Sequence, residues 1–254
     1  MKKLFAIALF AAVGMSACSK DSDVTSPEDT KTYVQVTIPE EMVSAQTRTS
    51  IDGNTTNWVE GDRVAVLLYD GSVTRTCLFT ADKSGATTTF SGDVPVGSYT
   101  LAAAYYPYDC SASFDAVNKT FKHTWGDAYC TSNLADYDFM YTNIWEEPFS
   151  VDETSTVLPV NFTFKPLMAR IKITLGLGAN ETPRKIMLET DANVLPTAGT
   201  IDALGNFTAS SVTNAITIPT GQKEFVIGLL PVGIHSTLTV KVMTADGLTY
   251  SDKS

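Results

Sequence analysis

Apolar and polar residues alternate along most of this 254-residue chain with the period of two that is typical of β-strands. In residues 33–38, valine and isoleucine alternate with glutamine and threonine, so one face of the predicted strand is apolar. The longest such run, residues 167–177, predicts a strand with one buried side. Shorter runs with the same alternation lie at residues 64–68, 86–90, 101–105, 225–229 and 238–242.

Turn signals separate these runs. Residues 70–71 and 246–247 read Asp-Gly, which favours hairpin turns, and residues 91–93 read Ser-Gly-Asp, which predicts a turn after the run that ends at Phe90. No segment has a helical period over ten or more residues, and parallel strands would need helical crossovers. The sequence therefore predicts an all-β fold of antiparallel β-sandwiches.

The strand pattern is interrupted between residues 146 and 157, and we place a domain boundary near Thr154. This divides the folded part into an N-terminal sandwich, residues 33–154, and a C-terminal sandwich, residues 155–254, each of a size that suits one sandwich. One continuous large sandwich is the alternative.

The last turn, at residues 246–247, leaves few residues for the strand that returns from it. We therefore expect the C-terminal domain to be truncated, or to take its final strand from elsewhere. An open sheet edge of that kind invites strand addition by another chain.

The first 17 residues have the organisation of a lipoprotein signal peptide. Lys2 and Lys3 precede an apolar run at residues 4–13, and two small residues stand before Cys18. We expect Cys18 to be lipidated and to become the mature N-terminus, with an ordinary cleavage site near Cys18 as the alternative. Since no later segment is a long apolar run, this lipid is the only membrane contact that we expect.

Residues 18–32 are polar and acidic and predict a flexible linker. Asp21 and Asp23 resemble an acidic surface-export signal, and a solvated linker without such a signal is an equal alternative. The formal net charge of the whole chain is −10, and the loss of Lys2 and Lys3 takes it to −12, which disfavours a nucleic-acid partner.

Three cysteines follow Cys18, at Cys77, Cys110 and Cys130. None belongs to a Cys-x-x-Cys pair or a histidine cluster, so we expect no zinc site. An exported protein can form a disulfide, and Cys110 with Cys130 is the candidate pair. Free, buried thiols that act as small apolar side chains are the alternative.

The sequence contains little that predicts catalysis. Its two histidines, His123 and His235, are far apart and have no metal-ligand spacing. Asp136 and Asp138 could bind a cation or act as paired carboxylates, although a solvated loop is the preferred interpretation. Since the chain also lacks a phosphate-binding glycine loop, a Gly-x-Ser-x-Gly motif and a calcium loop, we predict no cofactor, no metal and no enzyme activity.

Aromatic residues are the remaining candidates for ligand binding, because several gather between residues 105 and 145. Tyr105, Tyr106, Trp125 and Trp145 could stack on a sugar, which makes a glycan-binding surface lipoprotein the alternative function. Packing in the core and against sheet faces is the more common role of such residues in sandwiches.

A series of short motifs runs along the chain in this order: Thr47-Arg48-Thr49, Trp58-Val59-Glu60-Gly61-Asp62-Arg63-Val64, Phe90 with Gly92, Gly97-Ser98-Tyr99, Ala104-Tyr105-Tyr106-Pro107, Asp138-Phe139-Met140, Phe162-Thr163-Phe164, Ala169-Arg170-Ile171-Lys172-Ile173 and Leu230-Pro231-Val232-Gly233. Their order resembles that of the fimbrillin family of outer-membrane lipoproteins. One departure is Lys165, where many members have histidine.

The resemblance implies two transthyretin-like β-sandwich domains in tandem and a role as a fimbrial (pilus) subunit, or a related surface lipoprotein, in cell adhesion. Its implied partners are other subunits, the outer membrane through the lipid anchor, and host or bacterial surface ligands. In members that polymerise, an arginine-specific protease removes an N-terminal segment with the first strand, and a strand of the next subunit takes its place.

In this sequence the first strand corresponds to residues 33–38, and Arg48 is the only arginine between Cys18 and Trp58. The resemblance therefore implies cleavage at Arg48. An uncleaved, exposed arginine is the alternative.

Overall fold

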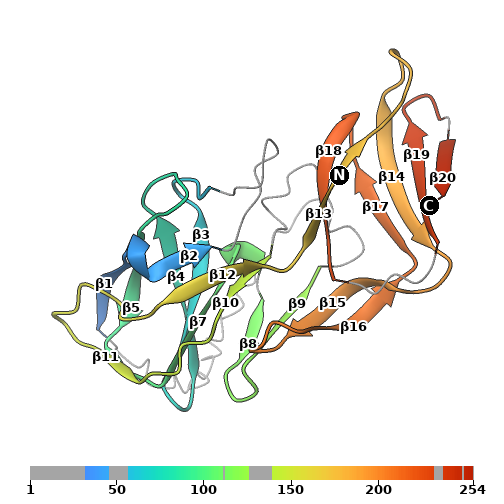
Figure 1. Cartoon of the computed structure of the whole chain (residues 1–254). Helices are drawn as coiled ribbons and strands as arrows, with labels where there is room; N and C mark the ends of the chain where they lie inside the picture. The colour runs from blue at the N-terminus through green and yellow to red at the C-terminus, as the bar shows by residue number, and fades with distance from the viewer. Residues whose placement is uncertain are drawn as a thin grey trace, which may run out of the picture. The chain divides into compact units, whose positions relative to one another are not determined.

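Strands make up nearly all of the regular structure in the computed structural model of this chain, which describes residues 32–45, 57–110, 112–125, 139–231, 237–247 and 249–253 (Figure 1). The all-β prediction is confirmed. The strands are β1 (Tyr33–Ile38), β2 (Val43–Ala45), β3 (Arg63–Tyr69), β4 (Thr74–Ala81), β5 (Phe90–Pro95), β6 (Gly97–Tyr99), β7 (Leu101–Tyr106), β8 (Ser113–Asp115), β9 (Thr120–Thr124), β10 (Met140–Thr142), β11 (Phe149–Val151), β12 (Phe162–Pro166), β13 (Ala169–Thr174), β14 (Pro183–Thr190), β15 (Leu195–Ile201), β16 (Phe207–Thr213), β17 (Ala215–Pro219), β18 (Glu224–Leu229), β19 (Leu238–Thr244) and β20 (Thr249–Lys253). Two short 3-10 helices, η1 (Glu40–Met42) and η2 (Tyr108–Cys110), join strands of the N-terminal half.

The largest sheet has eight strands in the order β1-β5-β4-β3-β7-β10-β12-β2. Its central strands β3 and β7 are buried on both faces, so their sequences are almost continuously apolar rather than alternating. Side chains on one face, such as Val66 and Ala104, belong to one buried cluster, whereas those on the other face, such as Leu67 and Tyr105, belong to a second. The sheet therefore lies between two hydrophobic cores.

We call the cluster that contains Val66 the first core and the cluster that contains Leu67 the second core. The first core is built only from residues 36–164. The second core adds buried residues of the C-terminal half, such as Ile186 and Ile218, to those of the N-terminal half.

The predicted division at Thr154 stays a prediction, and two sheets contain strands from both sides of it. The eight-stranded sheet includes β12, which follows residue 154, and the second of these sheets has the order β16-β15-β9-β8. β9 pairs antiparallel with β15, with Phe121 opposite Ile201 and Thr124 opposite Ala198. Both strands of the hairpin β8–β9 precede residue 154, and both strands of the hairpin β15–β16 follow it.

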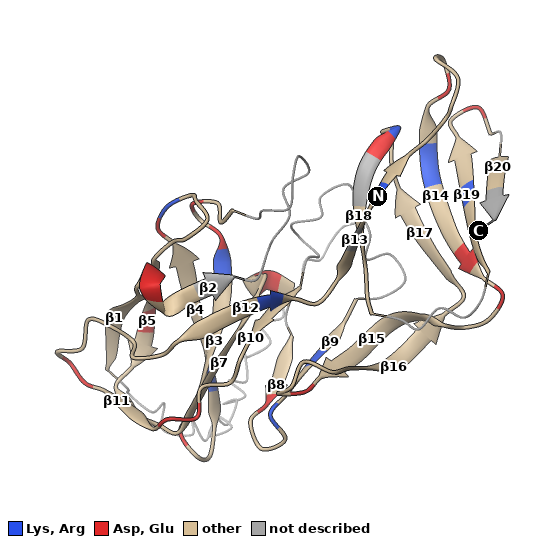
Figure 2. Ribbon diagram, in the orientation of Figure 1, with Lys and Arg blue, Asp and Glu red and all other residues tan. Residues whose placement is uncertain are grey.

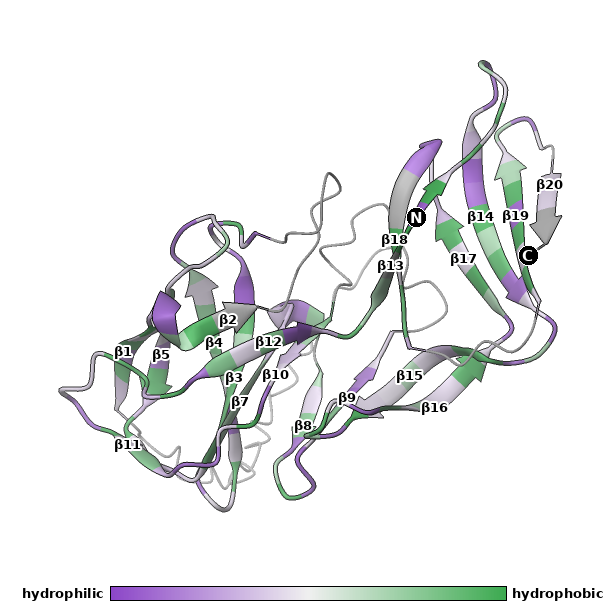
Figure 3. Cartoon of the chain, in the orientation of Figure 1, coloured by the Kyte–Doolittle hydropathy of each residue, from purple (hydrophilic) through white to green (hydrophobic). Residues whose placement is uncertain are grey.

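The rest of the C-terminal half forms a four-stranded sheet, β17-β14-β19-β20, and a two-stranded sheet, β13-β18. Alternate residues of β17 and β14 are buried, and β17 and β19 are coloured as hydrophobic over much of their length in Figure 3. The predicted turn at residues 246–247 joins β19 to β20, and Gly247 has a positive φ of 88° there.

The expectation for residues 167–177 is only partly correct. β13 covers residues 169–174 of this run, pairs with β18 alone among the described strands, and leaves 39% of the surface of Ile171 exposed. With one neighbouring strand, the apolar face of β13 is covered less completely than that of a central strand.

The turn predicted at residues 91–93 is wrong, because these residues lie inside β5 and pair with β1. Gly92 is a point of close approach: a Cβ atom there would lie 2.5 Å from the carbonyl oxygen of Leu78 and 2.6 Å from the ring of Phe79. A glycine inside a strand can therefore mark tight packing rather than a turn. Among the described residues, no helix is long and apolar enough to cross a membrane.

Candidate assembly site and aromatic pocket

The first strand, β1, is fully integrated into the large sheet. All six of its residues pair antiparallel with β5, from Tyr33 opposite Pro95 to Ile38 opposite Phe90. Its burial alternates as the sequence predicted, so that Val36 and Ile38 are 0% and 1% exposed and belong to the first core. β1 therefore provides both a complete hydrogen-bonded ladder and two core side chains.

The chain then crosses to the opposite edge of the same sheet. After η1, strand β2 pairs in parallel with β12, with Val43 opposite Phe162. Before the crossing, within β1, the backbone of Thr37 accepts a hydrogen bond from Leu158 N at 2.9 Å and donates one to the backbone oxygen of Thr156 at 2.9 Å. Residues 33–45 thus pair with strands at both ends of the sheet, and we call them the N-terminal clamp (Figure 1).

Aromatic rings fill the core that the clamp covers. Trp58 is 1% exposed, and its ring meets Phe90, Phe164 and Tyr106 edge-on at centroid distances of 4.9, 5.3 and 5.8 Å. Phe90 is also the partner of Ile38 in the β1–β5 ladder. Trp58 is therefore a core residue, and the clamp packs on an aromatic cluster.

The motif that follows Trp58 forms a tight turn. The carboxylate of Asp62 accepts a hydrogen bond from Val59 N at 2.8 Å, and Gly61 has a positive φ of 90°. The hydroxyl of Tyr106 donates to the same carboxylate at 3.3 Å. This contact joins the turn to the end of β7, where the Tyr106-Pro107 peptide bond is cis.

Several predicted sites lie outside the described residues. These are Cys18 with the signal peptide and linker, Arg48, Cys130, the carboxylates Asp136 and Asp138, and His235. The N-terminal clamp ends at Ala45, three residues before Arg48. Lipidation at Cys18 and cleavage at Arg48 therefore stay predictions.

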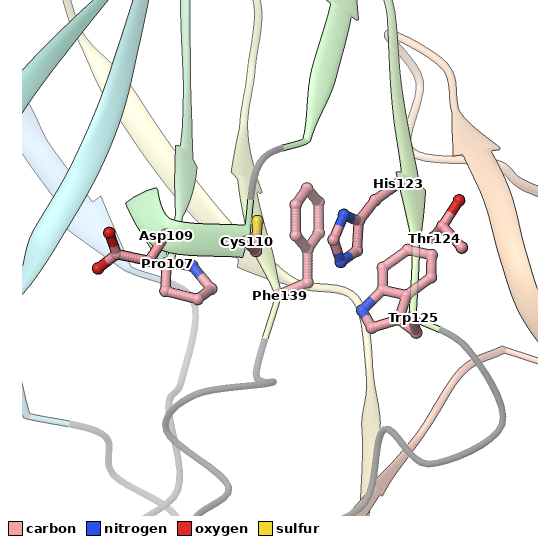
Figure 4. A pocket seen from close by; sticks show the side chains of 7 residues that line it. All are labelled: Pro107, Asp109, Cys110, His123, Thr124, Trp125 and Phe139. Carbon is pink, nitrogen blue, oxygen red and sulfur yellow. The ribbon is translucent and has the colours of Figure 1, made fainter. Parts of the chain in front are cut away.

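A pocket of about 370 Å³ lies where β7 and β9 end. Figure 4 shows Phe139 beside His123 and Trp125, with Cys110 and Asp109 on the other side. The imidazole of His123 stacks on Phe139 at 5.6 Å and meets the Trp125 ring edge-on at 4.5 Å. We call this space the aromatic pocket; it is lined by Pro107, Asp109, Cys110, His123, Thr124, Trp125 and Phe139.

The chemistry of the aromatic pocket is that of an apolar binding surface rather than of a catalytic centre. Burial lowers the pKa of His123 to about 4, so its imidazole is neutral near pH 7. Burial also raises the pKa of the Cys110 thiol to about 11, which disfavours the reactive thiolate. At the rim, Arg63 pairs with Asp109 at 3.1 Å and lies over the ring of Tyr108 at 5.0 Å.

The aromatic residues proposed for glycan binding lie mostly inside the protein. Tyr105, Tyr106 and Trp125 are 3%, 4% and 8% exposed, and Trp145 is half-buried against the first core. Tyr105 stacks on Phe139 at 6.0 Å, so its ring is engaged in packing. Of the four, only Trp125 lines the aromatic pocket, and glycan binding there stays a prediction.

The cysteines are free thiols where they are described. Cys77 is buried in the first core, and burial raises its pKa to about 11. Cys110 is half-buried at the pocket wall. Because Cys130 is not among the described residues, the disulfide between Cys110 and Cys130 stays a prediction. The described part of the chain contains no group of three or more histidine, cysteine or acidic side chains that could hold a metal ion.

Sequence reasoning missed β2 and the aromatic pocket. Three residues, Val43 to Ala45, are too few for an alternation to be recognised. His123 stood out only as one of two histidines, and nothing local in its sequence indicates that it stacks on Phe139. The short spacing of His123, in β9, and Trp125, just after it, was the one available signal.

Comparison with known proteins places the chain in a family. A model of the fimbrillin-like family matches residues 47–254, and the chain belongs to this family. Fimbrillin-like proteins are structural rather than enzymatic, and they assemble with other fimbrial subunits at the cell surface. No curated protein matches the sequence.

Solved structures from the genus Bacteroides share the fold. A proposed cell adhesion protein of Bacteroides uniformis has 16% sequence identity and a TM-score of 0.54, over 89% of this chain and 85% of that one. A proposed cell adhesion protein of Bacteroides ovatus has 16% identity and a TM-score of 0.50, over 88% and 87% of the two chains. At this level of identity the similarity concerns the fold.

Proposed function

We propose that this chain is a fimbrial subunit that takes part in adhesion and assembles by strand exchange. In this proposal the N-terminal clamp, residues 33–45, is removed after cleavage at Arg48, and a strand of another subunit takes the vacated place beside β5. The observation that carries the proposal is that one continuous segment pairs with strands at both ends of the large sheet.

The energetics favour replacement of the clamp rather than an empty site. Its removal would expose the edges of β5 and β12 and leave the space of Val36, Ile38 and Val43 unfilled. Each buried aliphatic side chain contributes roughly 1.5–3 kcal/mol. A donor strand restores both the ladder and the core if its alternate residues are apolar.

The same proposal gives the N-terminal lipid a temporary role. Cys18 precedes the clamp, so cleavage at Arg48 would release the lipid together with residues 18–48. The lipid at Cys18 would then deliver the precursor to the outer membrane, and the strand of another subunit would hold the mature chain in the fimbria. Without cleavage, the lipid would be a permanent anchor.

The first experiment treats the purified chain with an arginine-specific protease. We expect cleavage after Arg48 and a ladder of SDS-resistant polymers on gels of unboiled samples. The Arg48→Gln variant should stay intact at this site and form no ladder. Arg184→Gln, which changes an exposed arginine of β14, is the matched control and should polymerise like the wild type.

A second experiment tests the groove itself. A synthetic peptide of residues 33–45, added to freshly cleaved chain, should occupy the vacated site and suppress the ladder. The same peptide with Val36→Asp and Ile38→Asp, which cannot fill the core, should have no effect. A cleaved chain that stays monomeric without any peptide would contradict strand exchange.

A further inference from the structure

Two hairpin loops expose the most accessible large aliphatic side chains among the described residues. Val117, in the loop between β8 and β9, is 78% exposed, and Leu204, in the loop between β15 and β16, is 84% exposed. Folded proteins expose single aliphatic residues often, but here two occur at equivalent places in two adjoining hairpins. We call them the loop tips.

Both loops are held by the same arrangement of side chains. In the first, Asp115 accepts hydrogen bonds from Val117 N at 3.0 Å and from the side-chain amide of Asn118 at 2.7 Å. In the second, Asp202 accepts from Leu204 N at 2.9 Å and from the side-chain amide of Asn206 at 2.9 Å. Each aspartate therefore fixes a loop that presents its aliphatic side chain to solvent.

The two loop tips lie at the same end of one sheet. Because Phe121 pairs with Ile201, the start of β9 lies beside the end of β15, and the two loops adjoin (Figure 1). Two strand spacings, about 10 Å, separate the centres of the two hairpins.

β15 and β16 carry no charged residue and are tan throughout in Figure 2, so the acidic groups of these two hairpins are Asp115 and Asp202 in or beside the loops.

The aromatic pocket lies at the opposite end of the same strand β9. Phe121 is near the loop tips, whereas His123, Thr124 and Trp125 line the pocket roughly 7–13 Å further along. The pocket volume of about 370 Å³ exceeds that of one leucine side chain, and its walls include the rings of His123, Trp125 and Phe139. The rim pair Arg63 and Asp109 has no net charge, so it repels neither loop.

We propose that the loop tips of one copy insert into the aromatic pocket of a second copy, with Leu204 as the principal contact. The loop tips and the pocket residues His123 and Thr124 lie toward opposite ends of β9. Such a contact is heterologous, because two different surfaces of the chain meet. Heterologous contacts extend into open chains of copies rather than closing into a two-fold dimer.

This inference rests on the proposed function, since it adds a second contact between neighbouring subunits. It differs from strand exchange in one testable respect: it involves neither the N-terminal clamp nor cleavage at Arg48. The uncleaved chain should therefore self-associate weakly and reversibly.

Disulfide trapping gives the sharpest test, because Cys110 is a native thiol in the pocket. In the uncleaved whole chain with Cys18→Ser and Cys130→Ser, Leu204→Cys should form disulfide-linked dimers and higher species when copper phenanthroline oxidises the thiols. A further Cys110→Ser change should abolish them. Val59→Cys, at another exposed valine, is the matched control and should remain monomeric.

Sedimentation equilibrium tests the contact without a cross-link. Leu204→Asp, with or without Val117→Asp, should raise the dissociation constant of self-association at least tenfold, and Val59→Asp should leave it unchanged. A wild-type chain that is monomeric at every concentration overturns the proposal, as do cross-links that persist without Cys110. Neither result bears on strand exchange, which is read from the SDS-resistant ladder after cleavage.

Discussion

The two cores of this protein are built in different ways. The first core lies on one face of the large sheet, draws its buried residues only from positions 36–164, and contains the Trp58 cluster and part of the N-terminal clamp. The second core lies on the other face and joins residues of both halves, with the aromatic pocket at its margin. The first core is thus completed by a segment proposed to be removable, and the second by the C-terminal half of the chain.

Because of this difference, loss of the N-terminal clamp should affect the two faces of the large sheet unequally. If residues 33–45 leave, the first core loses three buried and two partly buried apolar side chains, whereas the second core contains no residue of that segment. The second core can therefore remain folded while the first awaits a new strand.

Trp58→Ala should be the most destabilising single change. The ring is 1% exposed and meets three other aromatic rings, so its removal leaves a cavity in the first core. We expect a loss of about 3–5 kcal/mol in the free energy of unfolding, measured by urea denaturation. Trp125→Ala in the second core should cost less, because that ring already borders the aromatic pocket. Equal losses would contradict the distinction between the cores.

Substitution of two glycines, Gly92 in β5 and Gly199 in β15, compares how tightly these two strands are packed. At Gly199 an added Cβ atom would lie 2.3 Å from the ring of Phe207, much as it would at Gly92 from the ring of Phe79. Phe79 is fully buried, whereas Phe207 is half-buried and has room to turn outwards. At both positions a backbone contact would remain, 2.5 Å to the carbonyl oxygen of Leu78 at Gly92 and 2.7 Å to that of Thr208 at Gly199. We expect Gly92→Ala to cost about 2–3 kcal/mol and Gly199→Ala about 1–2 kcal/mol.

The matched control for these substitutions is Gly176→Ala. No atom lies within 4 Å of a Cβ atom built at this position, so stability should hardly change. Thermal unfolding followed by circular dichroism is a sufficient measurement. A Gly92→Ala variant as stable as the control would show that β5 is less tightly packed against β4 than the distances indicate.

Acid should weaken the second core through His123. The pKa of this imidazole is lowered from 6.5 to about 4 by burial, so below pH 6.5 the unfolded chain binds a proton that the folded chain does not. The free energy of unfolding should therefore fall as the pH falls from 6.5 to 4.5, by at most about 2 kcal/mol. His123→Phe should flatten this part of the curve. Below pH 4.5 carboxylates with lowered pKa, such as Asp202, add a loss of their own.

The strands of the first core were the easier ones to predict from the sequence. β1 has a clear alternation that the structure confirms, with Val36 and Ile38 buried. In β7 the alternation of Leu101, Ala103 and Tyr105 was recognised, but the residues between them are buried as well, since the sheet is covered on both faces. Local periodicity finds a strand but does not tell how many of its faces are covered.

The candidate sites were harder to predict from the sequence, because some of them are formed by residues from distant segments. Arg48 and Cys18 were identified by short motifs, whereas the aromatic pocket requires Cys110, His123 and Phe139 to meet from separate segments. Gly92 was assigned to a turn because glycine is common there, and its true role depends on Phe79 in the neighbouring strand. Contacts between distant segments leave no periodic signal in the sequence.

The smallest effect on stability is expected at the loop tips. Leu204→Ser and Val117→Ser remove side chains that are 84% and 78% exposed, so each should change the free energy of unfolding by less than about 0.5 kcal/mol. Asp202→Ala should cost more than Leu204→Ser, because the carboxylate accepts hydrogen bonds from the loop backbone. Urea denaturation at low protein concentration, where copies are separate, is the appropriate measurement. A large loss of unfolding free energy in Leu204→Ser would mean that this side chain packs within its own copy. It would then not be free to contact a neighbouring copy.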